Sequence, residues 1–171
     1  MDVYDAVRAR FSCRNFLDKD VDPALLDKVL DAARLAPSAS NRQRWRVVVV
    51  RDAAARAKLA QAARGQAFVG QAPVVLAFCS EGDNDHVMTC GQLSYPIDTA
   101  IFIDHVALLC TAEGLGTCWI GAFHEDQAKA ALGIPDEVRV VELMPVGWPH
   151  AAGPSAKKRL SLEEIVHRDR W

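Results

Sequence analysis

One segment, residues 98–113, is apolar on nearly every side of the helix that its composition predicts. A helix at the surface of a globular protein normally has one apolar stripe and one polar face, so a helix without a polar face is covered from several directions. We therefore expect this segment to be a central helix surrounded by other elements, with Gly114 ending it. A chain of 171 residues is long enough to supply that surrounding structure within one domain.

Helices and strands are mixed along the rest of the chain. Asp22 followed by Pro23 is typical of a helix start, and the apolar spacing beyond predicts a helix to about Leu35. Four consecutive valines between Arg46 and Arg51 predict a strand buried on both faces. The other expected elements are a helix capped by Asp52, strands over 74–79, 117–120 and 138–146, a helix over 125–132, and a helix opened by the capping box of Ser161 and Glu164. Because strands and helices do not strictly alternate, we expect an α+β fold.

The chain contains no internal repeat and no low-complexity tract. We therefore expect a single domain over residues 1–171, in which residues 148–171 form a C-terminal arm. The segment Ser80–Pro96 is polar and contains glycine, and it is long enough to be a lid. The sequence pattern does not indicate the role of this segment.

The charge balance excludes two classes of partner. The chain has 22 acidic and 20 basic residues, a formal net charge of −2. A general nucleic-acid binder or a polybasic membrane-surface protein needs an excess of positive charge, so we expect neither partner. No apolar stretch approaches the roughly 18 residues that a membrane-spanning helix requires.

The cysteines and histidines predict no metal site and no disulfide framework. The five cysteines are odd in number, lack any CxxC spacing, and are expected to be buried thiols. The first twenty residues contain no apolar signal-peptide core, so we expect a cytoplasmic protein. The five histidines show no metal-ligand spacing, and no serine stands in a G-x-S-x-G setting.

Two basic segments have the chemistry of an anion site. Arg10, Ser12 and Arg14 bring two guanidinium groups and a hydroxyl together near the N-terminus, and Lys157 and Arg159 lie near the other end of the chain. Such donors satisfy a phosphate monoester through charge-assisted hydrogen bonds. Solvated surface cations are the alternative interpretation of either segment alone.

Two loop segments are further candidates. Residues 37–45 are rich in small and amide side chains between a helix and a strand, and they are either a binding loop or an ordinary connection. Residues 114–123 contain three glycines that allow a flat ligand to approach the backbone, but they do not form a GxGxxG motif. The aromatic residues Phe68, Tyr95 and Phe123 are either pocket walls or core packing.

These four segments, taken in order, resemble the FMN-dependent nitroreductase family over essentially the whole chain. The residues that carry the resemblance are Arg10/Ser12/Arg14, Pro37-Ser38 with Asn41-x-Gln43, residues 114–121, and Lys157-x-Arg159. The resemblance implies a central, mainly antiparallel sheet flanked by helices. It also implies an intertwined homodimer with exchanged C-terminal arms and with FMN at the subunit interface.

The resemblance further implies a role for each motif residue. The FMN phosphate would be held by Arg10, Ser12, Lys157 and Arg159. The same flavin would be contacted from the other subunit by Pro37, Ser38, Ala39 and Asn41. The ring would be lined by Trp119, Ile120, Gly121 and Ala122, and Phe11 is a further cofactor-binding candidate. Arg14 would approach the pyrimidine edge, where reduced flavin carries negative charge, and the Gly121 amide would donate to N5, the atom that exchanges hydride.

The resemblance implies an NADH- or NADPH-dependent oxidoreductase that reduces a nitroaromatic, a quinone or a similar flat acceptor by ping-pong hydride transfer, with no catalytic side chain. Reductive dehalogenation, flavin fragmentation, and noncatalytic flavin binding remain alternatives. Arg44 stands where the family often has proline, which changes the stiffness and charge of that loop. Ring contacts from residues 64–71 stay unassigned, with Gln66 as the one candidate.

Overall fold

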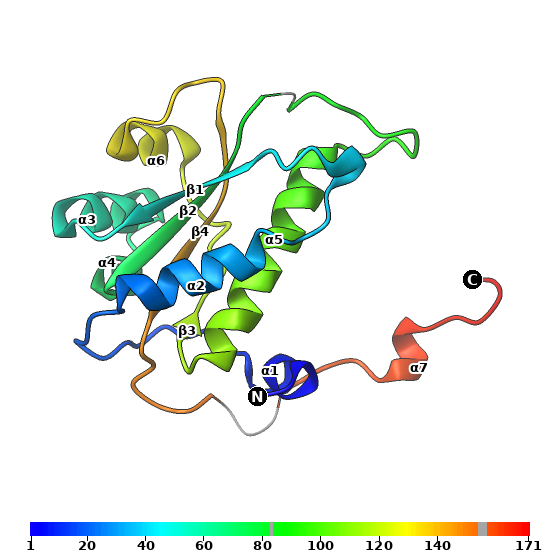
Figure 1. Ribbon diagram of the computed structural model, residues 1–171, viewed down its shortest axis with the longest axis horizontal. Helices are drawn as coiled ribbons and strands as arrows, with labels where there is room; N and C mark the ends of the chain where they lie inside the picture. The colour runs from blue at the N-terminus through cyan, green and yellow to red at the C-terminus, as the bar shows by residue number, and fades with distance from the viewer. Residues whose placement is uncertain (83, 154–156) are drawn as a thin grey trace.

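A four-stranded antiparallel sheet forms the centre of the protein. The computed structural model describes residues 1–82, 84–153 and 157–171. The strands are β1 (Trp45–Val50), β2 (Val74–Ser80), β3 (Gly116–Thr117) and β4 (Arg139–Gly147), and they lie in the order β1-β2-β4-β3 (Figure 1). All three strand pairs are antiparallel, so the mainly antiparallel α+β architecture is confirmed.

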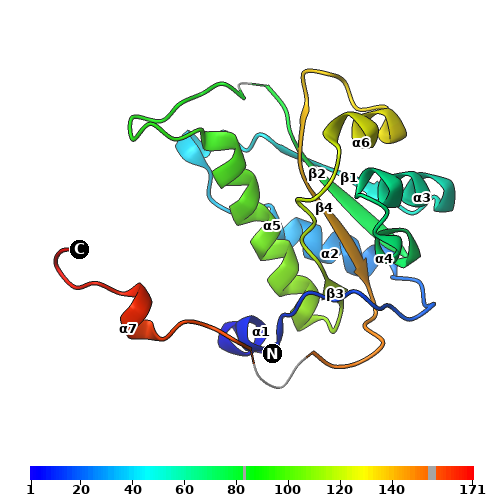
Figure 2. The ribbon, with the colours of Figure 1, turned by 180° about the vertical axis from the view of Figure 1, so that it is seen from behind.

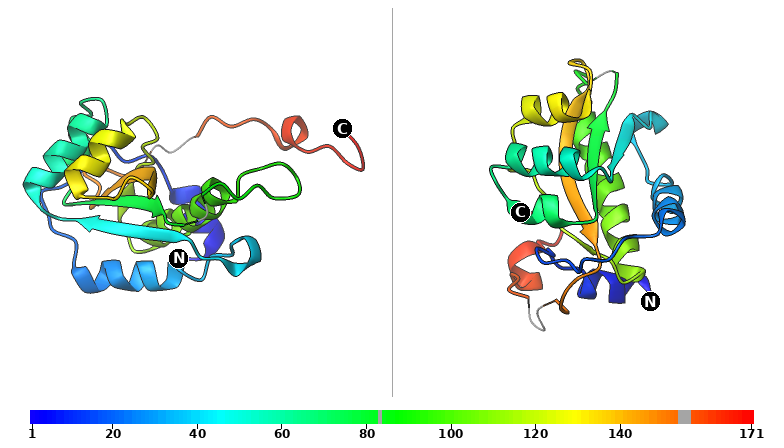
Figure 3. Two further views of the ribbon diagram at one scale, coloured as in Figure 1. Left: turned by 90° about the horizontal axis from the view of Figure 1, so that it is seen from above. Right: turned by 90° about the vertical axis from the view of Figure 1, so that its left-hand side faces the viewer.

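Helices cover both faces of this sheet (Figures 1 and 3). On one face lie α2 (Pro23–Ala33) and α5 (Ser94–Ala112), which pack against each other. On the other face lie α3 (Ala53–Ala62), α4 (Ala67–Gln71) and α6 (Glu125–Leu132). The short helix α1 (Val3–Ala9) packs against α5. The chain therefore has two hydrophobic cores, one on each face of the sheet.

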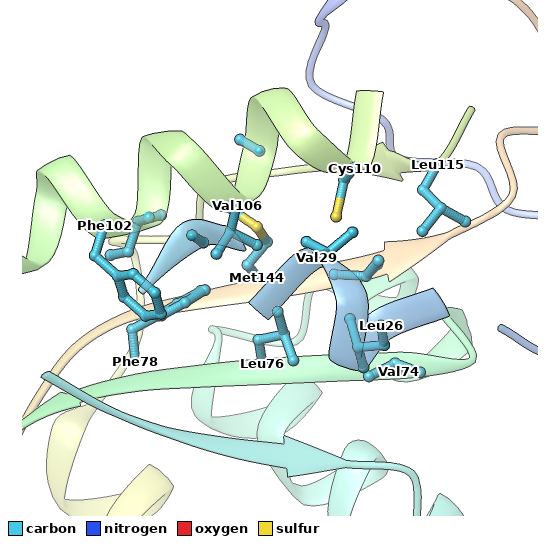
Figure 4. Close-up of a cluster of buried hydrophobic side chains, with 14 of the residues drawn as sticks. Leu26, Val29, Val74, Leu76, Phe78, Phe102, Val106, Cys110, Leu115 and Met144 are labelled. Atoms are coloured by element: carbon cyan, nitrogen blue, oxygen red, sulfur yellow. The ribbon is translucent and has the colours of Figure 1, made fainter. Parts of the chain in front are cut away.

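The alternation of side chains along β2 divides these two cores. Leu76 and Phe78 point into the core under α2 and α5, whereas Val75 and Ala77 point into the other (Figure 4). Phe102 of α5 completes the first core, because its ring meets Phe78 edge-on at a centroid distance of 5.7 Å. Strand β2 is buried on both faces, which confirms the buried strand that the continuous apolar run predicts.

A β-bulge changes this alternation in β4. Phe78 pairs with Glu142 and Cys79 pairs with Val140, which leaves Val141 as an extra residue. As a result, Val140 and Leu143 face the same core although they are three residues apart. The bulge lies directly beside Glu142, which becomes important in the site.

Several local signals act as the sequence predicts. Asp22 and Asp52 cap α2 and α3, with carboxylates that accept from backbone amides at 2.9 and 2.7 Å. The last helix, α7 (Leu162–Ile165), starts with both halves of the capping box formed by Ser161 and Glu164. These caps need only neighbouring residues, which explains why the sequence is sufficient to place them.

Three predicted elements differ from the structure. The valine-rich strand is not buried on both faces, because β1 lies at the edge of the sheet and Val49 is 40% exposed. Helix α5 begins at Ser94, so Pro96 lies in its first turn, where a missing amide breaks no helical hydrogen bond. The strand expected over 117–120 is reduced to β3, followed by an isolated bridge between Ile120 and Leu143.

The expectation that helix α5 is surrounded by other elements is wrong for the described part of the chain, because the sheet, α2 and α1 leave part of its surface open. This part of the helix exposes Ile97 and borders two open cavities of about 450 and 420 Å³. These cavities are lined largely by apolar residues of α1 and α5, together with Asp104 and His105. No helix in the described part of the chain is long and apolar enough to cross a membrane.

The C-terminal segment leaves the body beside α1 and projects away from it (Figures 1 and 2). Its first part is held to the body, because the His150 amide donates to the Asn15 carbonyl at 3.0 Å and Gly153 packs against the Phe11 ring. From residue 158 onward every residue is exposed. Residues 154–156 of the predicted arm, and residue 83 of the predicted 80–96 loop, lie outside the described residues.

Candidate functional site

The segment with Arg10, Ser12 and Arg14 runs beside β3. The Cys13 amide donates to the Thr117 carbonyl at 2.8 Å, and Ser12 forms a parallel bridge with Thr117. Cys13 is buried between exposed Ser12 and Arg14, as in an extended strand with two faces. Ser12 and Arg14 are thereby presented on the outer side, next to the segment that follows β3.

Three cations gather near the end of α1. The Lys157 ammonium donates to the backbone carbonyls of Arg8 and Arg10, where the helix leaves its last carbonyls without helical partners. Partial burial and the positive charges of Arg10 and Arg159 lower the pKa of Lys157. Within the described ranges no ion pair joins these cations to an acidic side chain. An anion is therefore the partner that this cluster lacks.

The segment after β3 presents its backbone to the same side. Ile120 exchanges two backbone hydrogen bonds with Leu143, at 2.9 and 3.3 Å, and its side chain is buried. Trp119 packs partly against the core under α5, whereas Gly121 and Ala122 are exposed. A flat ligand would therefore meet the backbone of residues 121–122 without displacing a large side chain.

The unassigned segment 64–71 also reaches this place. The Gln66 amide donates to the carbonyls of Ala63 and Ala122, at 2.9 and 3.5 Å. The guanidinium of Arg14 lies 6.0 Å from the centroid of the Phe68 ring. No local sequence signal predicts these contacts, because they depend on how α4 packs against α3.

Glu142 is a candidate site residue that the sequence did not indicate. A Cβ added to Gly121 would lie 3.6 and 3.7 Å from the two carboxylate oxygens of Glu142. Atom Oε1 is buried and has no hydrogen-bond partner in the described part of the chain. Burial raises the pKa of Glu142 to about 7, although a hydrogen bond with the Ile120 backbone opposes this increase. The available signal was one acidic residue within the apolar strand expected over 138–146.

The loop with Ser38 and Asn41 has an unusual backbone. Ser40, Asn41 and Gln43 have φ values of 52°, 54° and 52°, in the left-handed region that non-glycine residues seldom adopt. Two side chains hold this conformation. Asp98, 5% exposed, accepts from the Ala39 amide at 3.0 Å, and the Ser38 hydroxyl accepts from the Gln43 amide at 3.0 Å. Strained backbone that is held in this way is common at binding sites.

Arg44 connects this loop to the next one. Its carbonyl accepts from the Glu81 amide at 3.0 Å, and its guanidinium packs against Gly82. Gly82 has a φ of +86°, and a side chain there would collide with Arg44. The arginine therefore links residues 37–45 to the start of the 80–96 segment.

The single chain brings three of the four sequence motifs together. The segment 10–14, the segment 118–122 and the Lys157–Arg159 pair meet near β3 and α1, whereas the loop at 37–43 is attached to Asp98 near the start of α5 (Figure 2). Asp98 and Ala112, which lies near α1, are 14 positions apart, or roughly 21 Å along a helix axis. Pro37, Ser38, Ala39 and Asn41 are thus remote from the cation cluster of their own chain.

The four buried cysteines offer no reactive thiolate. All five are unpaired, and four are buried as expected, whereas Cys90 is exposed. Burial raises the pKa of Cys79 to about 11 and that of Cys110 to about 12, so both stay protonated at neutral pH. Burial also raises the pKa of Cys118, which Arg14 partly opposes. No group of metal-ligating side chains occurs among the described residues.

Comparison with known proteins places this arrangement in context. The family model described as "Nitroreductase family" matches residues 7–148. A protein of Thermus thermophilus named NADH dehydrogenase is 32% identical, and the match covers 97% of this chain and 95% of that protein.

Two solved structures with the same fold support the match to this family model. A nitroreductase family protein from Clostridium difficile is 31% identical and superimposes with a TM-score of 0.87, covering 100% of both chains. An NADPH:FMN oxidoreductase from Vibrio harveyi, in complex with NAD⁺, is 27% identical and superimposes with a TM-score of 0.89, covering 99% of this chain and 77% of the other.

The contact between Asp98 and the 37–43 loop leads to a prediction about stability. Replacing Asp98 with Ala leaves the Ala39 amide without its acceptor, which we expect to reduce the free energy of unfolding by about 1–3 kcal/mol. Urea unfolding of the Asp98→Ala variant measures the change. Asp27→Ala, which removes an exposed aspartate from α2, serves as the control and should stay within about 0.5 kcal/mol of the wild type. Equal losses in both variants would contradict the role of Asp98.

Proposed function

Because this chain belongs to the nitroreductase family, we propose that it is an FMN-dependent oxidoreductase that takes hydride from NADH or NADPH and reduces a nitroaromatic, a quinone or a similar flat acceptor by a ping-pong cycle. The observation that carries this proposal is the cluster of Arg10, Lys157 and Arg159 at one end of the segment 10–14, which runs on beside β3 toward the segment with the exposed residues 121–122. A flavin mononucleotide joins a phosphate to a flat ring. The residues present therefore fit both ends of this cofactor.

The phosphate end is assigned to the cation cluster and a neighbouring hydroxyl. We assign it to Arg10, Ser12, Lys157 and Arg159. Three positive charges without an acidic partner would be balanced by a nearly dianionic phosphate, and charge-assisted hydrogen bonds to it are among the stronger ones in proteins. Lys157 is already held in place by the carbonyls at the end of α1, so little of its freedom is lost on binding.

The ring end is assigned to the segment after β3. We place the ring against Trp119, Ile120, Gly121 and Ala122, with the Gly121 amide as the donor to N5, and we keep Phe11 as a further cofactor contact. The cofactor accepts and returns hydride at that atom. Arg14, exposed beside this segment, supplies positive charge to the pyrimidine edge and so favours reduction. We assign no catalytic side chain, because binding, orientation and charge are what these residues provide.

The loop at 37–43 is assigned to the flavin of a second subunit. Pro37, Ser38, Ala39 and Asn41 lie too far from their own cation cluster to share its ligand, whereas a second copy would supply the same loop from outside. We therefore propose a homodimer in which each site uses residues of both chains. The strained conformation of this loop is preformed in the single chain, held by Asp98.

The dimer would also cover the open side of α5. Val3, Tyr4 and Val7 of α1 and Ile97 of α5 are 63%, 69%, 54% and 41% exposed, and the two apolar cavities lie alongside. The C-terminal arm, which projects from the body with Leu162 and Ile165 exposed, is suited to packing on the partner. Exposed apolar surface of this extent marks an interaction site. The unpaired cysteines further support a reducing location, and we propose the cytoplasm.

The visible absorption spectrum tests the proposed activity. The purified protein, alone or after addition of FMN, should show a two-band flavin spectrum that NADH or NADPH bleaches without oxygen and a quinone restores. Bound flavin that neither nicotinamide reduces would contradict the hydride donor and favour a flavin-binding protein or another reaction. A protein that binds no FMN would overturn the whole proposal.

Charge reversal tests the phosphate site. Arg10→Glu and Arg159→Glu should each weaken FMN binding by about 10- to 150-fold, which corresponds to the roughly 1.5–3 kcal/mol of a hydrogen bond to a charged group. Quenching of flavin fluorescence measures the affinity. Lys58→Glu reverses an exposed charge on α3, on the other face of the sheet, and should leave the affinity unchanged. Unchanged affinity in both arginine variants would remove the phosphate from this cluster.

A charge placed on the open side of α5 tests the dimer. Ile97→Glu should shift the protein from dimer to monomer in sedimentation velocity, because it buries a carboxylate in the proposed interface. It should also weaken FMN binding, since the partner's loop is lost. Ala54→Glu adds the same charge near the start of α3 and should stay dimeric. A wild type that sediments as a monomer with FMN bound would contradict the shared site.

A further inference from the structure

Glu142 brings an ionisable group to the inner side of the segment assigned to the flavin ring. It lies in β4 opposite Phe78, beside the bulge at Val141, and its carboxylate faces the Cα of Gly121. Oε1 is buried without a hydrogen-bond partner in the described ranges, and no ion pair joins Glu142 to a cation there. A half-buried carboxyl with one buried, unpaired oxygen is an unfavourable choice for structure alone, because an apolar residue would fill the same strand position at lower cost.

The surroundings of Glu142 leave its charge uncompensated. On β2 its neighbour is Phe78, which carries no charge. On the segment after β3, the Ile120 backbone provides a hydrogen bond, and the Cys118 thiol feels the negative charge of Glu142, which raises the pKa of Cys118. Arg14 opposes that increase in the pKa of Cys118, whereas burial and the Ile120 backbone are what shift the pKa of Glu142. An ionised Glu142 thus adds negative charge on the N5 side of the site.

We propose that Glu142 is a positioning residue that couples uptake of a proton to reduction of the FMN in this site. The inference rests on the proposed function. Hydride transfer brings two electrons and one proton to N5 and leaves one negative charge on the ring. That charge and a carboxylate behind Gly121 repel each other, so reduction favours binding of one solvent proton to Glu142. The balance is one hydride to the ring, one proton from water to the carboxylate, and no bond formed between them.

The pKa of Glu142 lies where this coupling has an effect. A carboxyl with a pKa near its ordinary value would stay ionised through neutral pH, whereas burial raises the pKa of Glu142 to about 7. At lower pH the group is already neutral and does not oppose reduction. At higher pH it is ionised and opposes reduction. The midpoint potential of the flavin would therefore fall as the pH rises past neutrality. This fall would be larger than the one that proton uptake by the flavin itself causes.

The midpoint potential of the bound flavin as a function of pH tests this inference. Wild type and Glu142→Gln should have similar potentials at about pH 5 and diverge above neutral pH, with the wild type lower. A tenfold increase in the proton affinity of Glu142 on reduction corresponds to about 30 mV for a two-electron couple. The proton uptake of the flavin itself is common to both proteins and cancels in the difference. Glu137→Gln, which removes an exposed charge near the start of β4, should follow the wild type.

Infrared difference spectra provide a readout that needs no variant. On reduction of the wild type near neutral pH, the bands of a carboxylate should decrease and that of a protonated carboxyl should appear. If Glu142→Gln does not fold, this measurement on the wild type decides whether a carboxylate takes up a proton on reduction. A protein that binds no FMN fails the proposed function and this inference with it. A protein that binds and reduces FMN, but whose potentials superimpose on those of Glu142→Gln or whose carboxyl bands stay unchanged, refutes the role of Glu142 and leaves the proposed function in place.

Discussion

The absence of a polar face on α5 is the constraint on which the rest of the structure depends. One side of this helix packs on the sheet through Phe102, Ile103 and Val106, and it defines the first hydrophobic core (Figure 4). The opposite side is only partly covered within the described chain, by α1, whose own apolar residues are exposed next to it. A single copy of this chain cannot bury every side of a helix that is apolar all round, so part of its apolar surface stays in contact with water. The proposed dimer follows from that surplus of apolar surface.

The same helix separates the parts of the site. Asp98, near its start, holds the strained loop at 37–43, and α1 with the cation cluster lies near its end. Left-handed residues and unpaired cations both cost free energy in an isolated chain. Each is retained where a ligand would recover that cost, and the two lie about a helix length apart. A shared site between two copies accounts for both observations at once.

Much of the fold could be predicted because its signals are local. Aspartates before Pro23 and Ala53, the capping box at Ser161, and the apolar run of β2 act through neighbouring residues. The partial exposure of β1 could not be predicted, because a run of four valines is compatible with an edge strand as well as with a central strand. Of the site, the motif residues around Arg10, Gly121 and Lys157 could be named. The approach of Gln66 and Phe68 could not, because it depends on the packing of α4.

The order of residues alone determined most of the segments that become helices and strands, the near balance of acidic and basic residues, and which cations and glycines are available to a phosphate and a flat ring. These properties depend on residue type and near-neighbour spacing. Tertiary structure settled which of them meet. The unbroken pairing of β2 with β4 up to the bulge aligned Glu142 with Phe78, and the course of β4 beside residues 120–121 placed its carboxyl behind Gly121. Contacts between residues 21 positions apart arise from strand pairing, which no local pattern encodes.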